Sequence, residues 1–349
     1  MLGGMPAVTD LVASFPHRLS GHCGSGSLRA LLEHEGLDFG GGPLSEAAAF
    51  GLAGGLGFCF AELPGRRPPV YLVGRTAELE VDLGRTLGLG VDVVETDDPA
   101  EGWAALRAEL DAGRPAMVWA DIKHLEYLRV QMHNTRHAIV VVGYDEEAGV
   151  AWVADNDRDE LQRCSLASLA AARASEAFPG PARHRVFRYR WPVGLPEPRE
   201  AVRRALARAV VNMQDDVAFL PGVPAAGGLA GVAAFAASYP AWPARFGDAL
   251  DDALSGLGVF IVKAGTGGAM FRSLHAGFLH DMAGLLGDER LAALAAQYDE
   301  LAGAWVALAE AARARDHAAG LALVEEIARR EVAGVEAMRR TLEVESSFS

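Results

Sequence analysis

Hydrophobic and polar residues follow two different patterns along the chain, and the first extends to about residue 192. There, short runs rich in β-branched residues are bounded by turn-forming residues, a pattern that predicts strands. These runs are "PVYLVG" (69–74), "VDVVET" (91–96), "PAMVWAD" (115–121), "HAIVVVGYD" (137–145), "GVAWVADND" (149–157) and "HRVFRYRW" (184–191). Helices are predicted before and between them, over 24–35, 45–54, 76–88 and 99–112.

Two of these strands are close enough in the chain to form a hairpin. Only "EEA" (146–148) separates the run at 137–145 from the run at 149–157. A connection this short predicts an antiparallel pair. Folding the chain at 146–148 brings residues 137 and 155 to the same end of the ladder.

The second pattern is helical. "WPVGLPEP" (191–198) contains three prolines and predicts a linker. Beyond it, apolar residues recur at steps of three and four, which predicts a helix with one apolar stripe: Leu291, Leu294, Tyr298, Leu301, Trp305 and Leu308. The sequence therefore predicts an α+β domain with an antiparallel sheet over 1–192, followed by an all-α domain over 196–349.

The composition indicates the size of the core and the cellular compartment. The chain has 349 residues, half of them apolar, which is enough for two domains with a large core. Three widely spaced cysteines do not form a disulfide framework and favour a reducing compartment. The first residues lack the pattern of an export signal, and no apolar run reaches the ~18 residues of a membrane span. We expect a soluble, cytoplasmic protein that does not bind membranes.

The charge is strongly acidic but uneven. A formal net charge of −14 argues against nucleic acid as a partner. From Arg183 to Arg208, however, the sequence has eight arginines and only two acidic residues, Glu197 and Glu200, which gives a local charge of +6. This segment is either the solvated face of a strand and a helix or a docking patch for an acidic partner.

Cys23 is a candidate nucleophile. It stands in "HCGSGSLRALLEHEG", where turn-forming and hydroxyl residues precede a helical apolar run. The start of a helix favours the thiolate through its dipole and its free amides, and the same amides can bind an oxyanion. Most free cysteines are instead small core residues, so Cys23 alone does not establish an active site.

The predicted hairpin supplies partners for the thiol. An imidazole must accept the thiol proton, and a carboxylate or amide must orient that imidazole. His137 begins one strand and Asp155 ends the next, with Asn156 and Asp157 as further possible orienters. A cysteine at a helix start, then a histidine on a strand and an orienter on the following strand, is the papain-type order. The alternative is a surface histidine beside a solvated turn.

Several stretches carry a resemblance to a known family. "HCGSGSLRALLEHEG", "LSEAAAFGLAGGLGFCF", "RHAIVVVGYD" and "VADND" resemble the N-terminal domain of butirosin biosynthesis protein H, and "GTGGAMFRSLHAGFLHDMAGLLG" is similar to the helical domain of unknown function that commonly follows it. The resemblance implies a papain-like acyltransferase of antibiotic biosynthesis. Such an enzyme passes an acyl group from an acyl carrier protein thioester to a small-molecule amine, and needs no cofactor beyond the donor's phosphopantetheine. Cys23 would carry the acyl group, His137 would act as base and then acid, and Asp155 would orient His137.

Other residues are expected to contact the substrate or the oxyanion. Papain-like enzymes usually have a glutamine upstream as an oxyanion donor, whereas this chain has "HRLSGH", which leaves His17, Ser20 and the Cys23 amide as candidates. Four residues are expected to bind substrate: His22, Glu46, Asn156 and Arg272. Glu46 would hold the amine or the active-site loop, or simply complement a helix dipole. Arg272, behind "KAGTGG", would assist a phosphate seat, although tight packing also explains these glycines.

The same residues allow three other interpretations. The same triad could hydrolyse an amide or thioester, as in a cysteine peptidase or amidase. The chain could also be a catalytically idle binding or scaffold protein. A zinc site formed by His133 and His137 with His22 and Cys23 is disfavoured, because a spacing of four on a strand does not make a compact ligand pair, and no metal is expected. The sequence leaves a homo-oligomer open.

Overall fold

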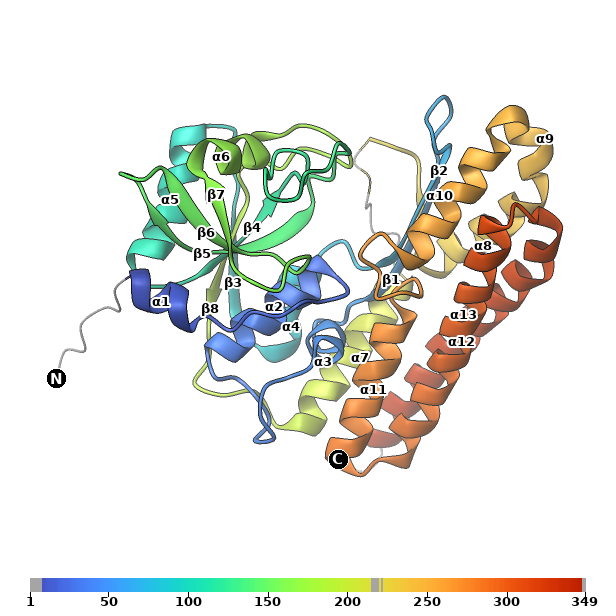
Figure 1. Cartoon of the computed structure of the whole chain (residues 1–349). Helices are drawn as coiled ribbons and strands as arrows, with labels where there is room; N and C mark the ends of the chain where they lie inside the picture. The colour runs from blue at the N-terminus through green and yellow to red at the C-terminus, as the bar shows by residue number, and fades with distance from the viewer. Residues whose placement is uncertain (1–7, 215–219, 221, 347–349) are drawn as a thin grey trace. The chain divides into compact units, whose positions relative to one another are not determined.

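A computed structural model of the chain describes residues 8–214, 220 and 222–346 (Figure 1). These residues form two compact units, and each unit combines two separate stretches of chain. The first unit is Met1–Leu44 with Leu89–Gly194, and the second is Ser45–Gly88 with Leu195–Ser349. Residues 1–7, which bear on the expectation about an export signal, lie outside the described part. Within it, no helix is long and apolar enough to cross a bilayer.

A six-stranded antiparallel sheet forms the centre of the first unit. Its strands, in spatial order, are β3 (Gly90–Val94), β8 (Val186–Arg190), β4 (Ala116–Ala120), β5 (His137–Asp145), β6 (Val150–Ala154) and β7 (Gln162–Ser165). The five strands predicted from β-branched runs in this unit are confirmed. The sequence did not predict β7, because its four residues, "QRCS", lack an apolar run.

Helices cover both faces of this sheet: α1 (Val8–Ser14), α2 (Cys23–His34), α5 (Pro99–Asp111) and α6 (Leu166–Ala174). Successive residues of a strand point to opposite faces. Accordingly, Ile139 and Val141 of β5 join a core with Leu106 of α5 and Leu169 of α6, whereas Val140 lies on the α2 side. The sheet is therefore buried on both faces, which explains its nearly continuous apolar strands.

The predicted hairpin is confirmed. β5 and β6 pair antiparallel, with Val140 opposite Ala154 and Asp145 opposite Val150. The register places the first residue of β5, His137, beside the residue that follows β6, Asp155. The register shifts by one residue between Val141 and Gly143, so the placement of these two side chains depends on this irregularity as well as on the length of the connecting turn.

The second unit is mostly helical and includes a small antiparallel sheet in the order β2 (Val70–Arg75), β1 (Leu56–Glu62) and β9 (Ala226–Gly227). Its helices are α3 (Glu46–Leu52), α4 (Leu79–Leu87), α7 (Pro198–Gln214), α8 (Gly228–Ser238), α9 (Trp242–Phe246), α10 (Leu250–Val262), α11 (Arg272–Leu286), α12 (Glu289–Arg313) and α13 (His317–Ser346). Two 3₁₀ helices, Tyr239–Ala241 and Gly247–Ala249, flank α9. The six residues of the predicted stripe all lie in α12 and are all buried, so this prediction is confirmed.

Residues 45–88 belong to the second unit, although the sequence-based division at 192–196 placed them in the first domain. Their packing gives the reason. Gly51 of α3 lies so close to the Phe278 ring of α11 that a Cβ there would be 1.9 Å from the ring. Phe58 of β1 contacts the rings of Phe235 and Trp305. Prediction from the sequence assigns consecutive residues to one domain. No local sequence pattern indicates that residues 45–88 belong to the other unit.

A buried ion pair lies at the centre of the second unit. Arg272 and Glu331 are both fully buried, with Nε–Oε1 and Nη2–Oε2 distances of 2.7 and 3.0 Å. Nη1 of Arg272 donates to the carbonyls of Gly57, Gly74 and Met270. The guanidinium is therefore enclosed by protein acceptors, which argues against the predicted phosphate seat. Tight packing explains the glycines instead, since a Cβ on Gly267, at φ +65°, would be 2.6 Å from Leu274.

Glu331→Gln should strongly destabilise the second unit. The substitution keeps the shape of the side chain but leaves the Arg272 guanidinium buried without its counter-charge, which typically costs about 3–5 kcal/mol. Urea unfolding measures this loss. Glu300→Gln is the matched control, because Glu300 pairs with Arg330 at the surface and is 66% exposed, and it should cost under about 1 kcal/mol. Similar losses for both variants would contradict this role of the ion pair.

Candidate active site

Cys23 is the first residue of α2, and His22 is its N-cap. His22 has an extended backbone, with φ −144° and ψ 136°, and its Nδ1 accepts the amide of Ser25 at 3.2 Å. The hydroxyl of Ser25 lies 3.0 Å from the same nitrogen. Cys23 is partly buried. It therefore lies at the positive end of a capped helix, where a thiolate is favoured.

His137 connects the thiol to a carboxylate. Its Nε2 lies 2.8 Å from Oδ2 of Asp155, and its ring also hydrogen-bonds the Cys23 thiol. Because Nε2 is held by the carboxylate, Nδ1 is the nitrogen left to share a proton with sulfur. The structure thus brings the three predicted catalytic residues into one hydrogen-bonded chain.

Asp155 is fully buried and accepts three donors. These are His137 Nε2, the Tyr127 hydroxyl at 2.8 Å and the Asp157 amide at 3.2 Å. Burial alone would raise the pKa of Asp155, but the His137 charge and these hydrogen bonds hold the pKa below its usual range. Burial and the negative carboxylate raise the pKa of Tyr127 well above its ordinary value, so its hydroxyl remains a donor.

The charges of the site favour an ion pair. Burial would raise the pKa of Cys23, but the electrostatic influence of His22 and the hydrogen bonds from both imidazoles hold it well below its ordinary value. Burial would lower the pKa of His137, yet Asp155 and the thiolate raise it well above the ordinary value. Between these two pKa values, the site holds a thiolate and an imidazolium, the reactive state of a cysteine nucleophile.

Asn156 clamps the segment that leads to Cys23. The side-chain Nδ2 of Asn156 donates to the main-chain carbonyl of Ser20 at 3.1 Å. The main-chain carbonyl of Asn156 accepts the Ser20 amide, also at 3.1 Å. The Ser20 side chain lies over Gly26, where a Cβ would be 2.6 Å from the Ser20 hydroxyl oxygen. Asn156 therefore positions the helix start, and His137 is oriented by Asp155.

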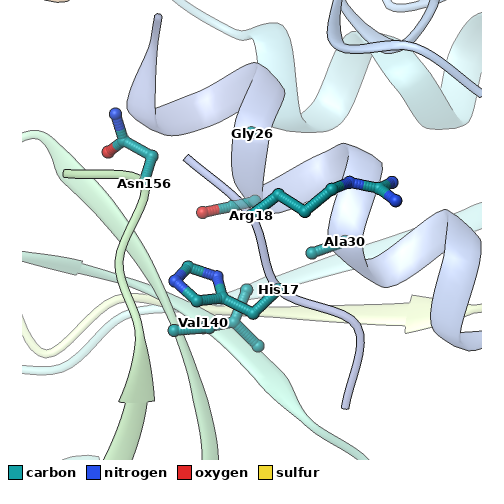
Figure 2. Close-up of a pocket in the computed structure, with 8 residues that line it drawn as sticks. His17, Arg18, Gly26, Ala30, Val140 and Asn156 are labelled. Carbon is teal, nitrogen blue, oxygen red and sulfur yellow. The ribbon is translucent and has the colours of Figure 1, made fainter. Parts of the chain in front are cut away.

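A small cavity lies beside this clamp (Figure 2). It has a volume of about 10 Å³ and is lined by residues from α2, β5 and the segment before Cys23, including His17, Gly26 and Asn156. Organic substrates occupy pockets of ~300–1,000 Å³, so this cavity does not hold one. Nε2 of His17 donates to the Arg158 carbonyl at 2.8 Å. His17 is thus committed to that carbonyl, which argues against it as an oxyanion donor. The Ser20 hydroxyl near Gly26 is buried and has no hydrogen-bond partner among the described residues, so it stays a candidate donor.

Two predicted substrate-binding residues lie in the second unit. Glu46 stands in the first turn of α3, behind the N-cap Ser45, where its charge complements the helix dipole. Arg272 is the buried partner of Glu331. Neither belongs to the unit that holds Cys23. Tyr127 was not predicted as a site residue, because it lies in an irregular loop where neither hydrophobic periodicity nor motif spacing indicates a function.

A second polar cluster, formed by Asp121, His124 and His133, has potential ligand atoms within 4.8 Å of one another. The Asp121 carboxylate is buried and already accepts four protein donors. These donors are the amides of Lys123 and Asn134, the Ser175 hydroxyl and Nδ1 of His133. A metal ion would have to displace one of them, and the Lys123 ammonium lies 3.2 Å from His133 Nε2. The cluster instead ties together the loop that carries Tyr127.

The arginine-rich segment is paired with acidic residues within each unit. All eight arginines pair with a carboxylate of their own unit, which favours the solvated-face interpretation over a docking patch. The pairs are Arg183–Asp97, Arg185–Glu95, Arg188–Glu109, Arg190–Asp92, Arg199–Asp288, Arg203–Glu200, Arg204–Glu200 and Arg208–Asp82.

Comparison with known families gives two matches. Residues 22–156 match the family model described as butirosin biosynthesis protein H, N-terminal, and residues 167–339 match a domain of unknown function, DUF4872. The first match begins at His22 and ends at Asn156, so it spans the three residues of the hydrogen-bonded chain. No curated protein matches the sequence.

His137→Ala should slow alkylation of Cys23 by iodoacetamide about tenfold or more at pH 7. Without the imidazolium, the thiol returns toward a pKa of ~8.5 and is only a few per cent ionised. The variant should approach the wild-type rate as the pH rises beyond that value. His280→Ala is the control, because His280 is exposed and pairs with Asp299. Identical pH profiles for wild type and His137→Ala would exclude the ion pair.

Tyr127→Phe should move the acid limb of the alkylation profile to higher pH, by roughly one unit. Loss of one hydrogen bond to a carboxylate raises the pKa of Asp155 by the equivalent of ~1–2 kcal/mol, so Asp155 takes up its proton earlier as the pH falls. Tyr144→Phe is the matched control, since that hydroxyl donates to the surface carboxylate of Asp111 at 2.6 Å. An unshifted acid limb in Tyr127→Phe would show that the Tyr127 contact does not tune the site.

Proposed function

We propose, on the premise that this chain belongs to the family of butirosin biosynthesis protein H, that it is a cysteine-dependent acyltransferase of antibiotic biosynthesis. The proposed donor is an acyl carrier protein thioester, and the proposed acceptor is a small-molecule amine. The observation that carries the proposal is the hydrogen-bonded chain from the Cys23 thiol through His137 to the buried Asp155.

The order of elements supports a papain-like assignment for the first unit. The nucleophile opens a helix, the histidine begins a strand, and its orienter follows the next strand. Such a triad provides a nucleophile and a proton carrier, the two groups that acyl transfer requires. It needs no metal and no cofactor of its own, since the phosphopantetheine belongs to the donor protein.

The acylation step follows from the ion pair. The Cys23 thiolate attacks the thioester carbonyl carbon, and a new carbon–sulfur bond forms. The tetrahedral intermediate then collapses and releases the pantetheine sulfur, which takes the proton from the His137 imidazolium. The products are an acyl-Cys23 thioester, neutral His137 and the free pantetheine thiol.

Aminolysis returns the site to its starting state. The amine nitrogen attacks the acyl carbon, and neutral His137 accepts a proton from that nitrogen. The Cys23–acyl bond breaks, the amide leaves, and the thiolate–imidazolium pair is restored. Asp155 stays ionised throughout and stabilises the imidazolium. Hydrolysis uses the same groups with water in place of the amine, so the product distinguishes the two reactions.

Cys23→Ala and Cys23→Ser should abolish acyl transfer and leave the fold intact, because small residues are tolerated at a helix start. Mass spectrometry after incubation with an acyl carrier protein thioester should show an acyl adduct on the wild type and none on Cys23→Ala. Cys164→Ala is the matched control, since burial raises the pKa of Cys164 to about 11, and it should retain both adduct and turnover.

Two results would contradict the proposal. Normal turnover by Cys23→Ala would exclude the nucleophile. Release of the acyl group as a free acid, with no amide formed from any amine supplied, would make the protein a hydrolase.

A further inference from the structure

A pocket in the second unit contains none of the residues that the mechanism above uses. It has a volume of about 450 Å³, within the ~300–1,000 Å³ range of pockets that hold organic ligands. The end of the β1–β2 hairpin forms one side, and α9 with the 3₁₀ helix that follows it forms the other. The lining includes Glu62, Pro64, Arg66 and Arg67 from the hairpin, and Arg245 and Phe246 from α9.

The two sides of this pocket are fixed to each other and to the rest of the unit. Glu62, the last residue of β1, accepts the Ser238 hydroxyl at 2.6 Å and also pairs with Arg245 of α9. The hairpin turn packs against α10 so closely that a Cβ on Gly256 would be 2.6 Å from Pro68. The pocket is therefore shaped by contacts within the protein, and its walls are in place before a ligand binds.

The lining is cationic, although the protein is acidic. Three arginines and one carboxylate give the lining a net charge of +2, whereas the whole chain has a net charge of −14. Glu62 is already paired with Arg245. The Arg67 side chain is 74% exposed and lies 3.3 Å from Asp252, a surface pair of the kind that contributes little. Among the described residues, no carboxylate pairs with Arg66. Two guanidinium groups at the pocket are therefore available to an anion.

The polar and apolar parts of the lining together indicate a class of ligand. A guanidinium donates two parallel N–H bonds to a phosphate or carboxylate, and a phosphate has enough oxygens to accept from more than one guanidinium. Phe246 and Pro64 add apolar surface, and the Phe246 ring packs on Trp242 with 5.6 Å between the ring centroids. A bare inorganic anion would leave this apolar surface unused.

We propose that this pocket binds a small organic phosphate, with the phosphate held by Arg66, Arg67 and Arg245 and the organic part packed against Phe246 and Pro64. The inference goes beyond the proposed function and does not rest on it, because it involves neither Cys23 nor acyl transfer. A phosphopantetheine group and a nucleotide both have this chemistry, and the experiment distinguishes them.

Isothermal titration calorimetry of the full chain tests the pocket with five probes. Phosphopantetheine and AMP carry both a phosphate and an organic part, pantetheine and adenosine lack the phosphate, and inorganic phosphate lacks the organic part. Phosphopantetheine or AMP should bind with a Kd of about 1 mM or below. That probe should also bind about tenfold or more tightly than inorganic phosphate and than its own counterpart without phosphate. The tighter of the two organic phosphates identifies the source of the phosphate.

Arg66→Gln should weaken binding of that probe about tenfold or more, because charge-assisted hydrogen bonds to the phosphate are lost. Arg66→Lys should recover only part of this loss, since lysine keeps the charge but not the planar fork. Arg66 is exposed, so neither substitution disturbs a core. Arg340→Gln is the matched control, because the Arg340 side chain is 65% exposed in the same unit and lies 4.0 Å from Glu336. It should bind the probe as the wild type does.

Three results would overturn the inference: no binding of either organic phosphate, equal affinity for the probes without phosphate, or equal affinities in Arg66→Gln and Arg340→Gln. Cys23→Ala, which lacks the proposed nucleophile, should bind the probe as tightly as the wild type. Loss of binding in Cys23→Ala would place the ligand in the first unit and would also overturn the inference. If the wild type binds the probe but forms no amide from any carrier thioester, the proposed function fails while this site stands.

Discussion

The site depends on a carboxylate that the fold has removed from water. An unpaired buried carboxylate costs several kcal/mol and would take up a proton. Asp155 remains ionised because three donors converge on it from three places in the chain: His137 at the start of β5, Tyr127 in the loop after β4, and the amide of Asp157 in the next turn. The resulting charge orients His137, and through it the thiol, so the reactivity of Cys23 follows from the burial of Asp155.

Much of this arrangement could be predicted from local patterns. The short predicted connection was enough to indicate an antiparallel hairpin and to place His137 and Asp155 at the same end of it. The exact register was not predictable, because the observed connection spans 146–149 and the pairing shifts between Val141 and Gly143. The helix at Cys23 was visible because turn-forming residues precede an apolar run. The buried stripe of α12 was visible because helical periodicity persists over 18 residues, from Leu291 to Leu308.

Contacts that form only when distant segments of the chain pack together could not be predicted from the sequence. Tyr127 lies in an irregular loop, where nothing in the spacing of residues indicates that its hydroxyl reaches Asp155. Arg272 stands at the start of a helix behind glycines, a position typical of an anion site, and only the fold reveals Glu331 beside it. The arginines at 183–208 suggested a positive patch because their acidic partners are mostly distant in the chain.

The interleaved order of the two units has a consequence for biosynthesis. The second unit begins with residues 45–88 and is completed only by the C-terminal stretch from Leu195 onward. During translation, strand β1 and its partner β2 leave the ribosome well before the helices that bury Phe58 and Phe60 exist. At roughly 5–20 residues per second, this apolar segment waits about 10–50 s for residues 89–349. Throughout that interval its aromatic side chains have no native core to pack into. Because of this chain order, the apolar segment needs to be shielded from water and from other chains until the C-terminal helices are made.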